Sequence, residues 1–158
     1  MKILKVTTYA ALGICGALSL SLAVAQHNHR HAASSTDTRV AVEFPAAMRE
    51  HTLTSMRDHL LAISQIQEAM GNNQYDKAAE IAETRLGQTA LKAHNAHENA
   101  KFMPKGMQDI GTQMHRSASK FAIEVQNSGA TGDMKPAMLA FGKTTQACVA
   151  CHAGYKLK

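Results

Sequence analysis

Aromatic residues are scarce in this sequence: they make up 4% of its 158 residues, with four Phe, three Tyr and no Trp. This scarcity argues against the aromatic platforms on which single-stranded nucleic acids stack. Three cysteines are too few for a disulfide-dense scaffold. With 3 Pro and 10 Gly, a turn-rich all-β fold is also disfavoured. Aliphatic side chains and nine methionines remain to fill a core, unless a group from outside the sequence occupies part of the interior.

The first 25 residues have the features of a secretory signal peptide. Lys2 and Lys5 precede a long uncharged run, and Ala23-Val24-Ala25 forms a small-residue cleavage site. A membrane anchor is the alternative, because the run is long enough to span a bilayer. Its small and polar residues favour cleavage, so we expect a periplasmic protein without a membrane span. Cys15 is removed with the signal, leaving Cys148 and Cys151 in an oxidising compartment.

Residues 26–43 are polar and lack hydrophobic periodicity, which predicts a flexible arm. His27, His29 and His31 offer ligands for a stray metal ion, but a solvated tail is favoured because nothing fixes their geometry. The net charge of +5 is modest and scattered along the chain. It gives no indication of nucleic-acid binding.

From residue 44 onward, apolar residues recur with helical spacing in four segments. The segments are expected at 44–70, 75–99, 107–128 and from about 133 onward. In the first, the expected buried seam consists of Leu53, Met56, Leu60, Ile63 and Met70, with Ile66 beside it. Four such helices with short connections predict an all-α fold, an antiparallel four-helix bundle over residues 44–158.

Glycine, asparagine and proline mark the boundaries of these segments. Gly71-Asn72-Asn73 is typical of a helix C-terminus, and Pro136 suits the first turn of the fourth helix. Residues 129–132 are expected to form the loop before that helix. Gly87 is unfavourable within the second segment, by about 1 kcal/mol relative to alanine.

The sequence Cys148-Val149-Ala150-Cys151-His152 is a C-x-x-C-H motif, the signature of covalent c-type haem attachment. Two cysteines three residues apart lie on one face of a helix. Their thiols can therefore add to the two vinyl groups of one porphyrin edge, and His152 can reach the iron.

Three other readings of the motif are weaker. A zinc site needs further ligands that no second C-x-x-C supplies. A thioredoxin-like pair follows a strand, and no strand pattern is evident here. A plain disulfide would not require His152.

The C-terminal position of the motif is informative as well. Together with Tyr155-Lys156 and the connection Gly71 to Asp76, it resembles class II c-type cytochromes, the cytochrome c-prime family and its low-spin relatives. The resemblance covers residues 44–158, although Gln74 stands where the family usually has proline. It implies a four-helix bundle with one covalent haem c, His152 as the proximal iron ligand and Lys156 beside it. Pairing of two copies through the first two helices is common in the family.

The same resemblance places the distal residue on the first helix. Counting back from Gly71 leads to Ser55 and Met56. Met56 is the candidate axial ligand because it lies on the expected apolar seam and Ser55 does not, so that His152 and Met56 would both bind the iron. A thioether there stabilises ferrous iron and suits an electron carrier. Anchoring the alignment on Arg49 instead places Leu53 over an open iron. His59, His51 and another methionine remain alternatives, and ordinary core packing is the usual role of such a Met.

Other residues carry weaker indications. His94 and His97 are spaced to chelate a metal, although a polar surface face is the favoured interpretation. His115 can contact a haem propionate or face solvent. The methionine-rich segment 101–107, with two lysines, can cover a haem edge and meet an acidic redox partner.

The sequence thus predicts a periplasmic monohaem cytochrome that carries single electrons between redox partner proteins and is not an enzyme. The alternative is a five-coordinate haem protein that binds nitric oxide or carbon monoxide at an open distal face. A haem peroxidase is disfavoured because no distal His–Arg pair is evident.

Overall fold

A computed structural model describes residues 36–158 of the chain. The expected signal peptide and the histidines at 27, 29 and 31 lie outside the described residues. The described part is mostly helical, which confirms the all-α prediction. None of its helices combines the length and the apolar character needed to cross a membrane.

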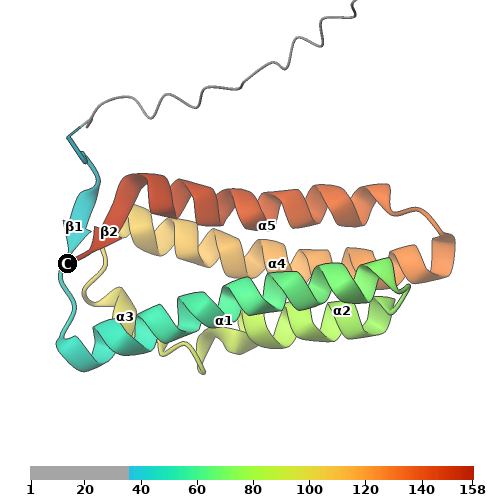
Figure 1. Ribbon diagram of the computed structural model, residues 1–158, viewed down its shortest axis with the longest axis horizontal. Helices are drawn as coiled ribbons and strands as arrows, with labels where there is room; N and C mark the ends of the chain where they lie inside the picture. Colours follow the sequence, from blue (N-terminus) through green and yellow to red (C-terminus); the bar gives the residue numbers. More distant parts are fainter. Residues whose placement is uncertain (1–35) are drawn as a thin grey trace, which may run out of the picture. The chain divides into compact units, whose positions relative to one another are not determined.

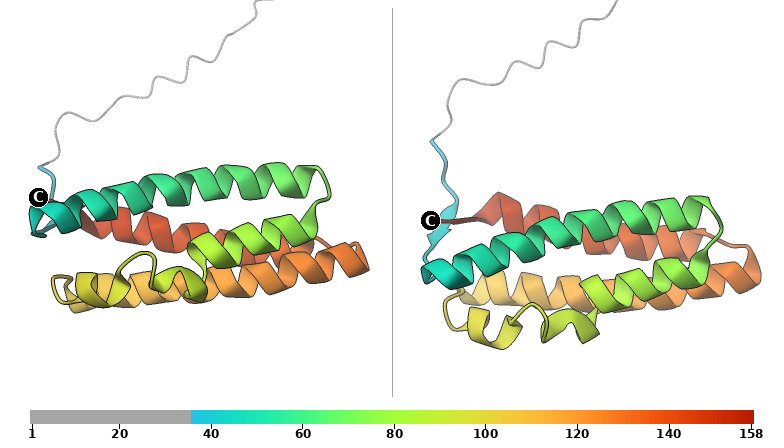
Figure 2. Two further views of the ribbon diagram at one scale, coloured as in Figure 1. Left: turned by 90° about the horizontal axis from the view of Figure 1, so that it is seen from below. Right: turned by 60° about the horizontal axis from the view of Figure 1, so that its bottom comes forward.

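Three long helices dominate the fold and run side by side (Figures 1 and 2). They are α1 (Ala46–Gly71), α4 (Lys105–Thr131) and α5 (Lys135–Gly154). Their bounds agree with the segments expected at 44–70, 107–128 and beyond 133. The loop expected at 129–132 is shorter, because α4 continues to Thr131. Gly132 then ends α4 with a φ of +76°, a left-handed conformation that glycine adopts without strain.

The second expected helix, at 75–99, is wrong in its later part. The structure has a short helix α2 (Tyr75–Ile81), a π-helical turn η1 (Ala82–Leu86), a 3-10 turn η2 (Gln88–Leu91) and a short helix α3 (Ala96–Ala100). Gly87 is extended, with a ψ of −172°, and interrupts the helical path. Thr89 donates backbone and side-chain hydrogen bonds to Glu83, which close the loop around Gly87.

A small parallel sheet joins the two ends of the described chain. Strand β1 (Val40–Val42) pairs with β2 (Tyr155–Leu157), and Val40 lies opposite Tyr155. The prediction that residues 26–43 form a flexible arm is therefore wrong at its C-terminal end, where three residues form a strand. The backbone pairing stabilises this stretch despite its polar neighbours and holds it beside the end of α5 (Figure 1).

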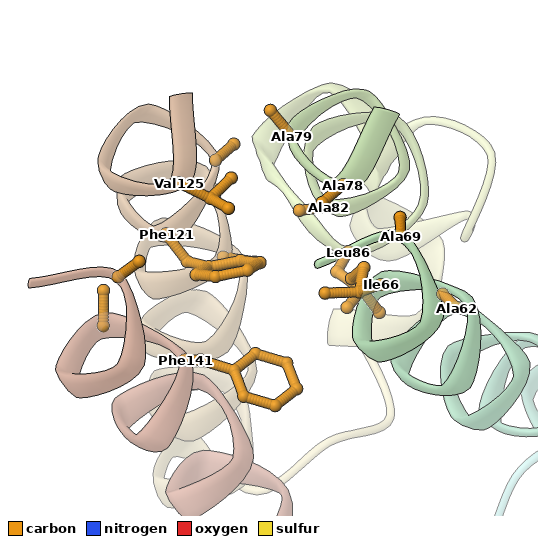
Figure 3. Packing of buried hydrophobic residues seen from close by; sticks show 14 of the residues in the cluster. Ala62, Ile66, Ala69, Ala78, Ala79, Ala82, Leu86, Phe121, Val125 and Phe141 are labelled. Atoms are coloured by element: carbon orange, nitrogen blue, oxygen red, sulfur yellow. The ribbon is translucent and has the colours of Figure 1, made fainter. Parts of the chain in front are cut away.

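The larger core cluster lies between α1, α2, α4 and α5 (Figure 3). Phe121 and Phe141 pack with their ring centroids 5.0 Å apart, and Ile66 and Leu86 complete the largest buried side chains. Alanines fill much of the rest, so helices can approach closely with few aromatic residues. A smaller cluster of Val42, Phe44 and Met107 lies under the sheet.

The seam predicted for the first helix is not the face that α1 buries. The structure buries Thr52, His59, Ala62 and Ala69, together with Ile66, which the prediction had placed beside the seam. Leu60 is 70% exposed, and Leu53, Met56 and Ile63 are half-buried. The face with small residues packs against neighbouring helices, while the larger apolar side chains border cavities.

Candidate functional site

The C-x-x-C-H motif occupies the last turns of α5, between the two core clusters. Cys148 packs against the larger cluster and Cys151 against the smaller one. Both are free cysteines and half-buried. The Cys148 thiol donates to the backbone oxygen of Thr144 at 3.6 Å, and burial raises the pKa of both thiols. At neutral pH the two sulfurs are therefore protonated thiols.

Three cavities meet at this point, and Met56 and Cys151 line all of them. The cysteine cavity, of about 220 Å³, lies between α1, α4 and α5 and is bordered by Cys148 and His152. The strand cavity, of about 250 Å³, is bordered by His152 and by all three residues of β2. The histidine cavity, of about 190 Å³, is bordered by His59, His94 and His115.

The spacing of the helices explains why these cavities exist. The backbones of α4 and α5 lie close along their length, whereas α1 has few close approaches to α5. Leu60 and Ile63 of α1 and Ile110 of α4 line the cysteine cavity without filling it. Large apolar side chains exposed beside two thiols indicate space for a bulky apolar group.

The structure separates the candidates for the distal position. Met56 borders all three cavities and faces the same space as the cysteines and His152. Leu53 borders the strand cavity alone, and His59 borders the histidine and cysteine cavities. His51 is exposed and borders none of the three.

His152 and Lys156 lie on the other side of the motif. His152 is exposed and borders both the cysteine and strand cavities, and Lys156 borders the strand cavity with it. The Lys156 ammonium donates to Asp37 at 3.1 Å, and Asp37 also accepts from Arg39. Arg39 in turn approaches the backbone oxygen of His152 at 3.4 Å. Asp37, which precedes β1, thus holds Arg39 and Lys156 near the C-terminal end of α5 and offsets one of their two charges.

The histidine cavity holds a cluster that the sequence analysis missed. His59 of α1 and His115 of α4 are each 8% exposed, and His94 joins them from the irregular segment before α3. His59 Nε2 lies 3.4 Å from Nδ1 and 3.3 Å from Nε2 of His94. The polar surface face expected for His94 and His97 fits His97, which is exposed and does not border the cavity, but not His94, which is half-buried.

Burial sets the charge of this cluster. It lowers the pKa of His59 to about 4, with the neighbouring His94 and His115 adding to the effect. Burial also lowers the pKa of His94 and of His115. All three imidazoles are therefore neutral at pH 7, and each keeps one ring nitrogen with a free lone pair.

The depressed pKa of His59 makes the protein sensitive to mild acid. In the unfolded chain His59 titrates near 6.5, so protons bind the unfolded state first. The stability that the neutral imidazole of His59 contributes, about 3 kcal/mol, is fully present above pH 6.5. It is lost as the pH falls towards 4. We expect the urea midpoint in metal-free buffer to fall across this range. The midpoint should fall less in His59→Gln than in the wild type, and as far in His97→Gln as in the wild type. An equal fall in the wild type and both variants would contradict the assignment of this effect to His59.

The segment 101–107 lies closer to the interior than a surface loop. Met103 and Met107 border the histidine cavity, and Phe102 packs edge-on against Phe44 with centroids 6.2 Å apart. Lys101 pairs with Glu98, and Lys105 pairs with Asp109. The methionines therefore point to the site, and the lysines lie on the exposed side.

Comparison of the chain with protein-family models, with curated proteins and with solved structures gave no match.

Proposed function

We propose that this protein is a periplasmic monohaem c-type cytochrome, an antiparallel four-helix bundle that carries single electrons. The observation that carries the proposal is the C-x-x-C-H motif on α5, whose two free thiols open into apolar cavities bordered by Met56. The proposal rests on the side chains of this motif and on the space beside them.

The residues at the site fit a covalently attached haem. Cys148 and Cys151 are three residues apart on one helix and can form two thioether bonds. The cysteine cavity is bordered mostly by apolar side chains, including Leu60 and Ile63, which water otherwise reaches. A flat apolar group in this space would cover them and would bridge the two core clusters. Burying that surface contributes about 25 cal/mol per Å².

The helical arrangement supports the bundle. α1, α4 and α5 supply three of its helices, and α2 with η1 supplies the fourth. The break at Gly87 shortens the regular part of the fourth helix but keeps its buried residues, such as Ala78 and Leu86, in the core.

Each residue of the site has a distinct task in this proposal. Haem iron, when bound, supplies the one-electron chemistry. Cys148 and Cys151 hold the group, His152 supplies an imidazole ligand, and Met56 supplies a thioether that favours the ferrous state. The apolar cavity walls keep water away from the group. Lys156 and Arg39 share the carboxylate of Asp37 and so leave one net positive charge near the exposed end of the site, where a redox partner with negative charge could approach.

Binding of a small gas is the second candidate. Met56 borders both the histidine cavity and the strand cavity, so displacement of this one side chain would join free space to the distal face. Leu53 would then border the open site.

One experiment separates these functions. We expect the purified protein to titrate reversibly as a one-electron couple and the reduced protein to bind carbon monoxide poorly. A high-spin ferric spectrum with ready binding of carbon monoxide after reduction would contradict the electron-carrier proposal and favour gas binding.

A further inference from the structure

Asp37 carries a negative charge that haem attachment does not use. Its two carboxylate oxygens accept from Nε and Nη2 of Arg39, at 3.0 and 2.9 Å, which is a bidentate pair. The Lys156 ammonium donates to the same carboxylate at 3.1 Å, from 119 residues further along the chain. The pairing with Arg39, and then that with Lys156, holds the pKa of Asp37 well below its usual range. Asp37 is therefore ionised at neutral pH.

The small parallel sheet at the end of α5 places the partners of Asp37 (Figure 1). Ala41 of β1 lies opposite Lys156 of β2. Successive side chains of a strand point to opposite faces. Because Tyr155 and Leu157 pack against the smaller core cluster, the side chain between them points away from that cluster. Backbone pairing therefore directs Lys156 to the face on which it meets Asp37.

The two cations that Asp37 holds lie beside His152. Arg39 and Lys156 both border the strand cavity, and His152 borders it with them. Arg39 Nη1 also approaches the backbone oxygen of His152 at 3.4 Å. This oxygen belongs to the last turn of α5, where unpaired carbonyls favour a nearby positive charge. Asp37 does not border the cavity, so it acts on His152 through the two cations and is a positioning residue.

A second carboxylate beside the sheet is paired in a similar way but is not connected to His152. Glu43 follows β1 and pairs with Lys158 at 2.6 Å. Neither Glu43 nor Lys158 borders the strand cavity. The two ends of the sheet thus carry two lysine–carboxylate pairs. The lysine of one pair borders the same cavity as His152, and the lysine of the other does not.

The net charge beside His152 affects how readily an electron is added there. Arg39 and Lys156 carry two positive charges, and Asp37 reduces their sum to one. Positive charge favours the state that holds the additional electron, so removal of the Asp37 charge favours reduction. The side chains of Asp37, Arg39 and Lys156 are 42, 40 and 37% exposed. Water and salt therefore weaken the effect, and it should be largest at low ionic strength.

We propose that Asp37 holds down the reduction potential of the protein by neutralising one of the two cations beside His152. This inference rests on the proposed function, because the charge has this role only in a protein with a one-electron site. It adds to that site a residue that precedes β1 and lies outside the helices.

Potentiometric titration of the haem-loaded protein at low ionic strength tests this role. Asp37→Asn should favour reduction by about threefold, which raises the potential by roughly 30 mV at 59 mV per tenfold. Asp37→Glu keeps the charge and should keep the wild-type potential. Arg39→Gln removes a positive charge and should lower the potential by a similar amount, and the double variant Asp37→Asn, Arg39→Gln should return it to the wild-type value. Added salt should reduce each difference.

Glu43→Gln is the matched control, because it removes the same charge from the pair that does not border the strand cavity. It should leave the potential unchanged. Hydrogen exchange of the backbone amides of residues 155–157, which does not depend on haem, should match the wild type in every variant.

Three results would overturn the role of Asp37. They are an unchanged or lower potential in Asp37→Asn, an equal rise in Glu43→Gln, or faster exchange of residues 155–157 in Asp37→Asn, which would assign the effect to loss of β2. Haem content, measured on the same samples, separates this failure from that of the proposed function. A wild-type protein without haem would overturn both, whereas a haem-loaded protein whose potential does not respond to Asp37 would overturn this inference alone.

Discussion

Replacing Cys148 and Cys151 together with alanine is expected to abolish covalent haem attachment completely. Both thiols border the cysteine cavity, and the described residues include no other cysteine. Without these two thiols, no thioether bond can form in the cavity between α1, α4 and α5. A haem stain after denaturing electrophoresis measures the result, since thioether bonds survive denaturation.

Cys15→Ala provides the matched control for this loss. Cys15 lies within the expected signal peptide, so its replacement should leave the haem stain at wild-type strength. The single variants Cys148→Ala and Cys151→Ala should retain one thioether at most. Full haem staining in the double variant, or loss of staining in Cys15→Ala, would contradict the assignment of these two thiols.

Met56→Ala is expected to convert the haem from a six-coordinate to a five-coordinate, high-spin state. Met56 is the first-helix residue that borders every cavity around the motif. Removing its thioether should eliminate the weak near-infrared sulfur-to-iron band of the ferric protein and permit carbon monoxide to bind after reduction. The reduction potential should fall by roughly 100 mV or more, a fraction of the range that axial ligands span.

Met70→Ala is the control for Met56, because Met70 lies on the same helix but packs against the larger core cluster. It should leave the spectrum and the potential unchanged. If Met56→Ala retains the near-infrared band, Met56 is not the ligand. If His59→Ala alone abolishes the low-spin spectrum, the imidazole of His59 holds that position and the Met56 assignment is wrong.

The helices were predictable because their signals are local. The spacing of apolar residues, Gly71-Asn72-Asn73 after α1 and Pro136 at the start of α5 all act within a few residues. The failure lay in the second segment. A glycine in a helical pattern usually costs about 1 kcal/mol without breaking the helix, whereas Gly87 is extended here because Glu83 and Thr89 close a loop around it.

The parallel pairing of β1 with β2 was also beyond local reasoning. Its two strands are three residues each and are separated by most of the chain. Neither strand has an alternating pattern long enough to predict it. The contact depends on the helices that bring residues 40–42 beside the residues that follow α5.

The candidate site also has one part that the sequence displays locally and another part that it does not. The roles proposed for Cys148, Cys151 and His152 follow from a contiguous motif, which a sequence displays directly. The histidine cluster does not, because His59, His94 and His115 meet through tertiary packing and through the break at Gly87. The seam predicted for α1 was wrong because an apolar residue beside a cavity and one in a protein core have the same spacing in the sequence.

The scarcity of aromatic residues has a physical counterpart in these cavities. Alanines, four larger aliphatic or methionine side chains and one pair of phenylalanines fill the larger core cluster, and the space beside Cys148 is bordered by side chains that do not fill it. A haem in that space would supply the large flat apolar group that the sequence lacks. This interpretation depends on attachment at the two cysteines.

The intact mass of the wild-type protein, exported and then denatured, tests the account most directly. The account predicts a chain that begins at Gln26 and is heavier by one haem, with no thiol free to react with an alkylating reagent. A chain of unmodified mass with two reactive thiols, or with a disulfide between Cys148 and Cys151, would contradict it.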